Sequence, residues 1–572
     1  MAMRVSGINS GLDTDAIVQE LVSAYSQKTE KYTKQQTKLG WKQEAWKNLN
    51  TKVYSLYNSV GKLRYSSAYS MKKTVSSDTT KATVSASSDA VNGTQKLHVL
   101  ATAQSGYLTG GKLLLRNEVT DGGKTTLETV SGSVKAETKL SELGYTGDGT
   151  SLSIRTKDAD GKDVVKNISL TKDSTIQDVV SALRDNGLNA SFDANNGRLF
   201  VSSKETGENA DFTLTGATTK QVEKKDDNGN VIKDDNGKPV MEEVELSDAE
   251  KAASKKLLGL LGLDTQSNEY SSQAKKIDGN DAVISLNGVM YTNTTNDFAI
   301  NGLNISVTGV TDDIPDGVDP KNVDVSSLSN STAISITTTT DNQGIYDMVK
   351  DFLTEYNNII NEVTKLYNAD SAGSYEPLTD DEKDKMSDTE IEKWETKIKD
   401  SLLRRDSSLS SIMNSMMTAM SSQIQIDGKT YSLSSFGIKT LGYLNAAENE
   451  QNAYHIDGDE DDENTSGNKD KLMAAITSNP DTVVEFMKQL STNLYKAIDD
   501  QMQSSSLRSR YKIYNDKELD KEYSNLTKTI KQWESKVSDK EDFYYKKFSN
   551  METALAKLQN QTSSLSSMLG SN

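Results

Sequence analysis

The segment VQELVSAYSQKTEKYTKQQTKLGWKQEAWKNLNTKVYSLYNSVGKL (residues 18–63) carries apolar side chains seven residues apart. This first seam position holds Val18, Tyr25, Tyr32, Leu39, Trp46, Val53 and Val60. A second position, offset by three, holds Leu21, Leu49, Leu56 and Leu63 and is interrupted by Lys28, Gln35 and Lys42. Two apolar positions in seven are typical of a coiled coil. The segment therefore predicts one long helix, with Asp13, Thr14 and Asp15 at its N-terminus.

The C-terminal segment repeats the pattern. Its first seam position holds Tyr523, Ile530, Val537, Tyr544, Met551, Leu558 and Leu565. The second position runs through Leu526 and Trp533 and shifts by one residue to Phe548, Leu555 and Leu569. We expect the two ends to be partner helices, each burying its stripe on the other or on neighbouring molecules. Lys28, Gln35 and Lys42 would weaken a lone two-helix coil, because an unpaired buried lysine is costly.

The middle of the chain has a different pattern. Residues 72–330 alternate short β-rich runs with turns, which predicts β-structure. Asn228-Gly229 and Asn236-Gly237 lie in a duplicated KDDNG motif and predict type I′ hairpin turns. Residues 341–422 return to helical spacing, and Asp427-Gly428 predicts a further hairpin. The fold class predicted is multidomain α+β, with a helical coiled-coil stalk and legs from both termini, a helical-plus-β middle domain and β-rich head domains inserted between.

Composition excludes several classes of function. The net charge is −18, which disfavours nucleic-acid binding, and the apolar share of 34% favours several small cores. With no cysteine, thiol catalysis and cysteine-ligated metals are excluded. His98 and His455 lie in no catalytic or metal motif, and the acidic run at 457–463 is interpreted as a solvated hairpin tip. We predict no catalytic residues, no cofactor, no metal and no membrane insertion.

Several motifs resemble the flagellar hook-associated protein 2 family. They follow that family's order along the chain. They are GINSGLDTDAIVQELV (7–22), YEPLT (375–379) followed by EIEKWETKIKDSLLRRD (390–406), FGIKT (436–440), HID (455–457), NPDTVVEFM (479–487) and FYYKKFSNMETALAKLQNQTSSLSSML (543–569). The resemblance weakens between residues 106 and 276, where the variable part of the head is expected.

The resemblance implies a cap at the tip of the bacterial flagellar filament. Such a cap is a small homo-oligomeric ring, with a pentamer favoured, that promotes folding and insertion of exported flagellin. Implied partners are flagellin, the hook–filament junction proteins and a dedicated export chaperone. The implied location is extracellular, at the distal tip, after passage through the flagellar type III export channel. That route needs no cleaved signal peptide, and the N-terminus does not resemble one.

The resemblance also implies a division into four parts. These are a terminal helical leg (1–45 and 515–572), a helical stalk domain with β-hairpins (46–71 and 331–514), a β-rich head domain (72–105 and 273–330) and a variable head insert (106–272).

Contact residues follow from the seams. Contacts of the leg with flagellin or neighbouring subunits are expected at Val18, Tyr25, Tyr32, Leu39, Tyr544, Met551, Leu558 and Leu565. Coiled-coil packing in the stalk is expected at Trp46, Leu49, Val53, Leu56, Val60, Ile530, Trp533 and Val537. An alternative function is a surface adhesin whose head binds mucin or another host ligand. A glycosidase that uses only carboxylates is a remote third hypothesis.

Overall fold

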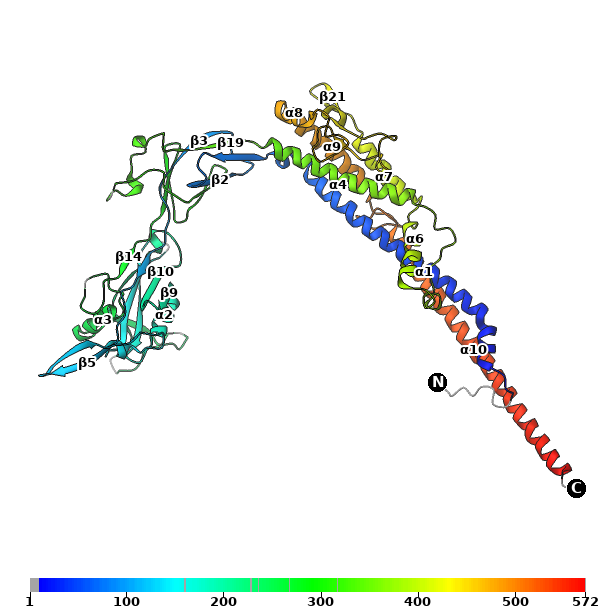
Figure 1. The fold of residues 1–572 in the computed structure, drawn as a ribbon, viewed down its shortest axis with the longest axis horizontal. Coiled ribbons are helices and arrows are strands. Elements are labelled where there is room, and N and C mark those ends of the chain that lie inside the picture. The colour runs from blue at the N-terminus through cyan, green and yellow to red at the C-terminus, as the bar shows by residue number, and fades with distance from the viewer. Residues whose placement is uncertain are drawn as a thin grey trace. The chain divides into compact units, whose positions relative to one another are not determined.

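A computed structural model describes residues 10–158, 161–226, 229–234, 236–266, 268–315 and 317–570. The chain divides into two compact units. The first unit combines both ends of the chain, up to Met71 and from Asp341 onward, and the second unit is Lys72–Thr340. The second unit is therefore an insertion in the first, and Figure 1 follows the chain from the blue N-terminal helix to the red C-terminal helix.

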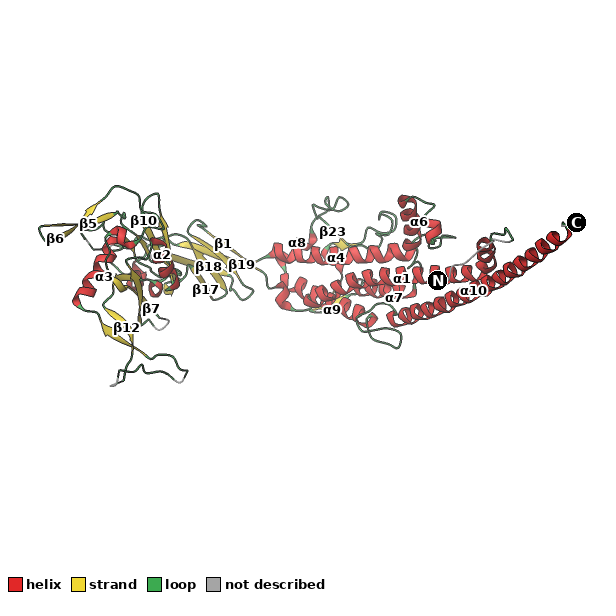
Figure 2. Cartoon of the chain, turned by 90° about the horizontal axis from the view of Figure 1, so that it is seen from below, coloured by secondary structure: helices red, strands yellow, loops and turns green. Residues whose placement is uncertain are grey.

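The first unit is mainly helical. Its helices are α1 (Thr14–Lys62), α4 (Asn342–Asn368), α5 (Asp380–Lys383), α6 (Asp388–Asp400), α7 (Ser407–Met420), α8 (Lys471–Ser478), α9 (Pro480–Gln501) and α10 (Asp516–Leu569). The prediction of one long helix at each end is confirmed, and α1 packs along α10 as the two views of Figures 1 and 2 show. Asp13 caps α1 by accepting a hydrogen bond from the backbone N–H of Ala16 at 3.0 Å.

A four-helix bundle forms the core of this unit. We define the bundle as α1 from residue 46 onward together with α4, α7 and α9. Each helix contacts the next in the cyclic order α1, α4, α7, α9 and back to α1. The bundle buries Trp46, Val53, Tyr356, Met416 and Phe486, so its interior is apolar on all four helices. This core, more than helix propensity, fixes the position of the C-terminal half of α1.

Two small β elements complete the first unit. They are the hairpin β20 (Ile424–Ile426) with β21 (Lys429–Tyr431), and β22 (Ile438–Lys439) paired with β23 (His455–Ile456). Asp427 has φ 49° and Gly428 has φ 75°, which confirms the hairpin turn predicted there.

The acidic run that follows β23 corrects a prediction. The segment 457–463 is not merely a solvated tip, because Asp457 is only 6% exposed. Lys439 forms an ion pair with Asp457 at 2.7 Å, and Lys350 bonds Asp459 at 2.6 Å. His455 is 2.6 Å from Asp462. The carboxylates are thus held by cations from α4 and β22, which local composition does not reveal.

The second unit is β-rich. Its strands are β1 (Lys72–Ser76), β2 (Ala82–Ala86), β3 (Gly93–Ala101), β4 (Tyr107–Thr109), β5 (Arg116–Asp121), β6 (Lys124–Thr129), β7 (Asp148–Lys157), β8 (Asp163–Thr171), β9 (Leu188–Asp193), β10 (Arg198–Ser203), β11 (Thr213–Gly216), β12 (Thr219–Glu223), β13 (Met241–Glu245), β14 (Lys275–Ile277), β15 (Ala282–Leu286), β16 (Val289–Asn293), β17 (Asp297–Ile300), β18 (Leu303–Val307) and β19 (Ile334–Thr340). The largest sheet has the order β1-β19-β3-β15-β16, so strands from both ends of the insertion are neighbours. A second sheet, β14-β4-β10-β9, belongs to a separate core.

Two helices interrupt this β-structure. Helix α2 (Ile176–Asp185) packs on β9 and begins with a capping box between Thr175 and Asp178. Helix α3 (Asp248–Leu260), which the β interpretation missed, begins with a capping box between Ser247 and Glu250. Each box leaves a readable Ser/Thr-x-x-Asp/Glu signal in the sequence, and at α3 the β-rich neighbourhood concealed it.

The second KDDNG motif forms a turn of another type than predicted. Asn228 lies outside the described residues. In the second copy, Gly237 has φ 76°, but Asn236 is not among the described residues with positive φ, so type I′ is wrong there. The Asp234 side chain accepts hydrogen bonds from the backbone of Asn236 and Lys238, both at 2.9 Å. This side chain closes a wider loop than a two-residue turn.

Two features of the described segments bear on function. No helix in them combines the length and apolar character needed to cross a bilayer. Nor do those segments bring three or more acidic or histidine side chains together in a metal-binding arrangement. His98 is buried and lies 2.8 Å from Asp312, a structural contact in the second unit.

Candidate functional site

The candidate site is the pair of terminal helices outside the bundle. We define the leg as α1 up to residue 45 together with α10. At its described end, the backbone N–H of Ser10 donates to Glu552 of α10 at 3.2 Å, and the Ser10 hydroxyl bonds the same carboxylate. The Tyr545 hydroxyl donates to Asp15 at 2.8 Å. Polar contacts therefore fix the start of α1 against α10.

The apolar seam near this end is narrower than predicted. Val18 and Val22 are both buried, whereas Leu21, assigned to the second seam position, is 42% exposed. The seam thus steps by four residues at this point, because an α-helix has 3.6 residues per turn and drifts against a strict seven-residue repeat. Leu21 is a correction to the predicted seam, and Val22 is the residue that replaces it.

An aromatic contact holds the middle of the leg. The rings of Tyr25 and Trp533 are 6.5 Å apart between centroids. The ammonium groups of Lys28 and Lys536 lie 4.6 and 4.2 Å from the Trp533 ring. Lys28 is therefore not the buried unpaired charge that the seam suggested, because it is exposed and rests on an aromatic face.

Polar pairs bind the leg further toward the bundle. Gln36 donates to Thr527 at 2.6 Å, and Gln43 donates to Asp520 at 2.9 Å. Lys42, another predicted interruption, forms an ion pair with Asp406 at 3.1 Å.

Helix α5 adds a lateral contact to α1. Lys34 lies 2.8 Å from the Glu382 carboxylate. The hydrogen bond from Lys34, together with those from the backbone and side chain of Thr379, holds the pKa of Glu382 below its ordinary value. These contacts hold the leg in one register along its inner half.

Ring stacking and hydrogen bonds join the leg to the bundle. Trp46 stacks on Tyr514 with centroids 5.3 Å apart and planes at 9°. Asn50 is buried and bonds the backbone twice, donating to the Tyr511 carbonyl at 3.2 Å and accepting from the Ile513 N–H at 2.9 Å. The segment that leads into α10 is thereby fastened to α1.

A second polar network lies about two turns further along α1. Tyr57 donates to Asp499 at 2.8 Å, and Arg510 forms an ion pair with the same carboxylate. Burial raises the pKa of Tyr57, as do its bonds to Tyr495 and Asp499. Burial alone would raise the pKa of Asp499, but the bonds from Tyr57 and Arg510 outweigh it and lower that pKa.

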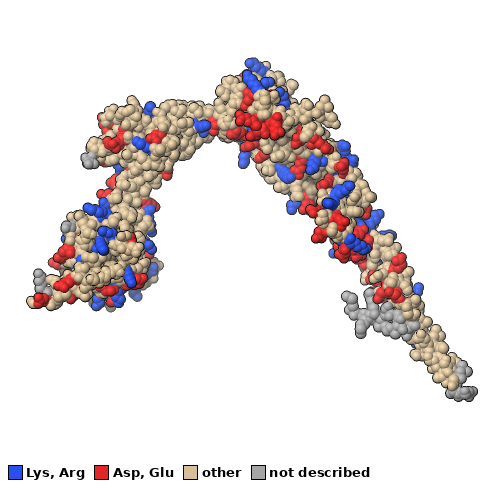
Figure 3. Space-filling view, in the orientation of Figure 1, with Lys and Arg blue, Asp and Glu red and all other residues tan. Residues whose placement is uncertain are grey.

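The distal end of α10 has a different character. Residues 553–569 extend past Glu552, the partner of Ser10, and the last charged residue is Lys557. In Figure 3 this end of the helix is tan, without acidic or basic side chains. Leu558 and Leu565 are each 58% exposed. This end therefore presents an uncharged surface with apolar side chains one seam repeat apart.

The predicted contact residues fall into three groups. Val18 and Leu39 are buried within the chain, Tyr25, Tyr32, Tyr544 and Met551 are half-buried, and Leu558 and Leu565 are exposed. Of the predicted stalk residues, Trp46, Leu49, Val53, Leu56, Val60 and Ile530 are buried, and Trp533 and Val537 are half-buried. Their roles in assembly stay predictions. The sequence analysis missed Val22, Tyr545 and Glu552; Val22 and Tyr545 lie beside predicted residues and could have been found from the helical period.

Comparisons with known proteins agree with one another. The family model described as "Flagellar hook-associated protein 2 N-terminus" matches residues 10–106, and the corresponding C-terminus model matches residues 279–560. Together they match about two thirds of the chain. A flagellar hook-associated protein 2 of Halalkalibacterium halodurans is 24% identical over 514 residues, which is 89% of this chain and 83% of that protein.

Solved structures of similar proteins share less sequence. The crystal structure of the D1-D2-D3 domains of the Escherichia coli flagellar cap protein FliD is 16% identical, with a TM-score of 0.43, and covers 79% of this chain and 95% of that one. FliD (HAP2) from Pseudomonas aeruginosa is 15% identical, with a TM-score of 0.27, and covers 49% of this chain and 93% of that one.

Proposed function

We infer that this chain, which belongs to the flagellar hook-associated protein 2 family, caps the tip of the bacterial flagellar filament. Proteins of this family are structural, so the chain is not an enzyme. It acts as an oligomer at the filament tip, where it promotes the folding and insertion of exported flagellin and so filament elongation. The adhesin hypothesis gains no support from the comparisons.

The paired terminal helices carry this proposal. A cap must hold the filament end while each arriving subunit inserts, so its contacts have to form and release repeatedly. The outer leg suits that task because α1 is held to α10 there by a narrow apolar seam and a few polar and aromatic contacts. The exposed leucines of the uncharged end supply surface for a second protein. Contacts of modest area dissociate more readily than obligate interfaces do.

The finer assignments extend the same proposal. A pentamer is the favoured ring, with flagellin and the hook–filament junction proteins as neighbours and a dedicated chaperone before export. Export through the flagellar type III channel places the chain outside the cell, at the distal tip of the filament. The absence of cysteine suits such a route, since no disulfide can lock the chain before it passes a narrow channel.

The domain borders are part of the proposal. The leg is assigned to 1–45 and 515–572, and the stalk domain to 46–71 and 341–514. The predicted border at 331 moves to 341, because β19 (Ile334–Thr340) pairs with β1 and β3 of the head. The head then comprises 72–105 and 273–340, and its variable insert comprises 106–272. The boundary at residue 46 is supported by Trp46, the first α1 residue in the bundle core.

Deleting residues 1–40 tests the function. Because the bundle core on α1 begins at Trp46, the truncated protein is expected to keep a folded bundle and second unit. Filament growth in a cap-deficient strain should be abolished, with secreted flagellin remaining unassembled. Filaments of normal length would overturn the assignment.

A point variant refines this test. Val18→Asp with Val22→Asp places charges in the leg seam, whereas Leu21→Asp places one on the exposed side of the same turn. We expect the double variant to shorten filaments severely and the control to leave their length unchanged. Equal effects of both would show that the seam itself is not required.

A further inference from the structure

The second unit contains two separate cores. We define the head core as the sheet β1-β19-β3-β15-β16 with its buried side chains, and the insert core as the sheet β14-β4-β10-β9 with its own. The chain passes between these sheets twice, at 102–106 and 278–281, and an antiparallel bridge joins Gln104 to Asn280 there. We call these two crossings the neck. Because each core buries its apolar side chains in a cluster of its own, polar contacts beside the neck help to set how one core sits on the other.

A loop of the insert touches the head beside the neck. The Thr206 hydroxyl donates to the Thr294 carbonyl at 2.6 Å, and the Glu208 N–H donates to the Asp281 carboxylate at 2.9 Å. Between these two residues, Gly207 has φ 106°. A Cβ on Gly207 would lie 2.9 Å from the Thr294 Cβ and 3.0 Å from the Asp281 carboxylate. The contact therefore requires glycine, both for its backbone conformation and for its lack of a side chain.

An ammonium group closes this contact into a triangle. Lys321 Nζ lies 2.8 Å from Oε2 of Glu208 and 2.9 Å from Oδ2 of Asp281. The bond to Glu208, and then that to Asp281, raises the pKa of Lys321 and so favours its charged form. Each of the three residues thus bonds to the other two.

Lys321 belongs to a strap that is fixed to the head core. We define the strap as the described residues between β18 and β19. Asp319 accepts a hydrogen bond from the Lys321 N–H at 2.9 Å. At the base of the strap, Asp312 accepts from the Thr332 hydroxyl at 2.5 Å and lies 2.8 Å from His98 of β3. These bonds join the two ends of the strap to each other and to the head core, so Lys321 reaches the insert from the head.

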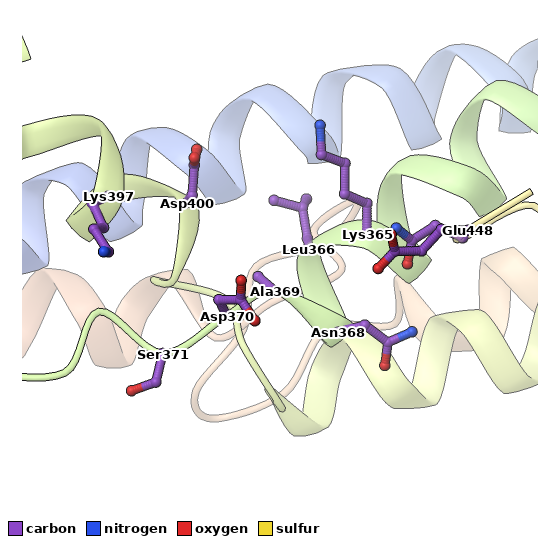
Figure 4. Close-up of a pocket in the computed structure, with 10 residues that line it drawn as sticks. Lys365, Leu366, Asn368, Ala369, Asp370, Ser371, Lys397, Asp400 and Glu448 are labelled. Atoms are coloured by element: carbon purple, nitrogen blue, oxygen red, sulfur yellow. The ribbon is translucent and has the colours of Figure 1, made fainter. Parts of the chain in front are cut away.

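Charged side chains that line one surface need not pair in this way. In the first unit, Lys365, Lys397 and Asp400 line a pocket of about 390 Å³, and Figure 4 shows them pointing in different directions. The three-way pairing beside the neck therefore reflects the placement of its side chains and not the density of charge alone.

We propose that Lys321, Glu208 and Asp281 form a latch that holds the insert core on the head core, and that the insert core turns about the neck when the latch opens. The two carboxylates bond to one nitrogen atom, so they lie close together and repel each other once its charge is removed. One side chain thus decides between attraction and repulsion. Salt also weakens the latch, because Lys321 is 33% and Glu208 is 56% exposed and such pairs are screened. The latch is independent of the proposed cap function.

Energy transfer between two dyes on the full-length protein tests the latch. The chain has no native cysteine, so Val75→Cys in β1 and Val165→Cys in β8 place one dye on each core at an exposed position. The latch variant is Lys321→Gln, and Gly207→Ala is a second variant that forces the contact apart. The control is Lys220→Gln, which breaks an ion pair within the insert whose lysine is equally exposed. Melting curves identify any variant that does not fold.

At about 0.1 M salt, we expect single molecules of the unmodified chain and of the control to form one narrow population. Both Lys321→Gln and Gly207→Ala should add a second population with a different transfer efficiency. Raising the salt to about 1 M shortens the Debye length from about 10 Å to about 3 Å. This should enlarge the second population of the unmodified chain and reduce that of Lys321→Gln, because salt screens attraction in the first and repulsion in the second. Adding Glu208→Gln to Lys321→Gln should reduce it as well.

Three results would overturn the latch. One is an unchanged distribution in both Lys321→Gln and Gly207→Ala. Another is a second population in the control as large as that in Lys321→Gln. The third is the same direction of salt response in the unmodified chain and in Lys321→Gln, because the carboxylates would then not act on each other.

Discussion

Helix α1 passes through two environments, and its halves differ although they share one seven-residue repeat. In the bundle half, Trp46, Val53 and Val60 are sealed by three other helices. In the leg half α10 is the main partner, with lateral help from α5 and α6, and Leu21 on the nominal seam is exposed. Burial therefore follows the packing around each residue and not the repeat alone. The bundle half stabilises the unit, and the leg half carries the seam that holds α1 to α10.

The largest effect should come from a charge in the bundle half. Val53 is fully buried, so Val53→Asp is expected to cost several kcal/mol of the free energy of unfolding, because the carboxylate would lack both water and a partner. The loss of unfolding free energy is measured by urea titration monitored with circular dichroism. Ser55→Asp, on the exposed side of the same helix, should change that energy by less than about 0.5 kcal/mol. Equal unfolding midpoints for the two variants would break the comparison.

The same change in the leg half should act locally. Val18→Asp is expected to separate α1 from α10 near residue 18 and to change the free energy of unfolding of the bundle by less than about 0.5 kcal/mol. Limited proteolysis should then cut within residues 14–39. The matched variant Leu21→Asp should keep the resistance of the unmodified protein. If Val18→Asp instead unfolded the bundle, leg and bundle would be one cooperative unit.

A smaller effect is expected at the aromatic contact of the leg. Trp533→Ala removes the ring that Tyr25 and Lys28 contact, for a loss of about 1–2 kcal/mol of pairing free energy. Hydrogen exchange should speed up for α1 amides near residue 25 and stay unchanged near Val53. Tyr523→Ala, which truncates a more exposed ring on α10, serves as control. Unchanged exchange near residue 25 would show that the contact adds nothing.

The smallest effect concerns pH and the bundle half. The pKa of Asp499 is lowered from its ordinary value of 3.8, so the unfolded chain binds this proton more readily than the folded one. Its contribution is therefore present above pH 3.8 and is lost as the pH falls through the lower pKa of the folded state. Asp499→Asn should reduce stability at pH 7 by less than about 1 kcal/mol and flatten its decline in acid. If the melting temperature falls at low pH in the same way for Asp499→Asn and the unmodified protein, this role of Asp499 is excluded.

Much of the helical framework could be predicted from the sequence. The seam from Val18 to Val60 and its C-terminal counterpart placed both long helices, because a sustained repeat has few structural alternatives. The assignment of Leu21 failed because the apolar stripe of an α-helix, with 3.6 residues per turn, drifts away from a strict seven-residue repeat. Near Leu21 the packing on α10 does not hold the stripe to that repeat.

The site details that escaped prediction depend on distant partners. The sequence suggested that Lys28 is a buried unpaired charge, but its ammonium group lies on the ring of Trp533. It also suggested that Asp457 is solvated, but Asp457 forms an ion pair with Lys439. Neither partner lies near in sequence to the residue it stabilises.

Cross-linking at the end of α10 tests the central claim most directly. The chain has no native cysteine, so Leu558→Cys can carry a single photoreactive probe at an exposed site of the leg, with Ser55→Cys as the equivalent site on the bundle. On filaments capped with labelled protein, we predict that light joins the Leu558 probe to flagellin and that the Ser55 probe gives little or no such product. Two results would contradict the assignment of the paired terminal helices as the part that contacts the filament. One is a flagellin adduct from the Ser55 probe but not from the Leu558 probe. The other is no flagellin adduct from either probe on fully capped filaments.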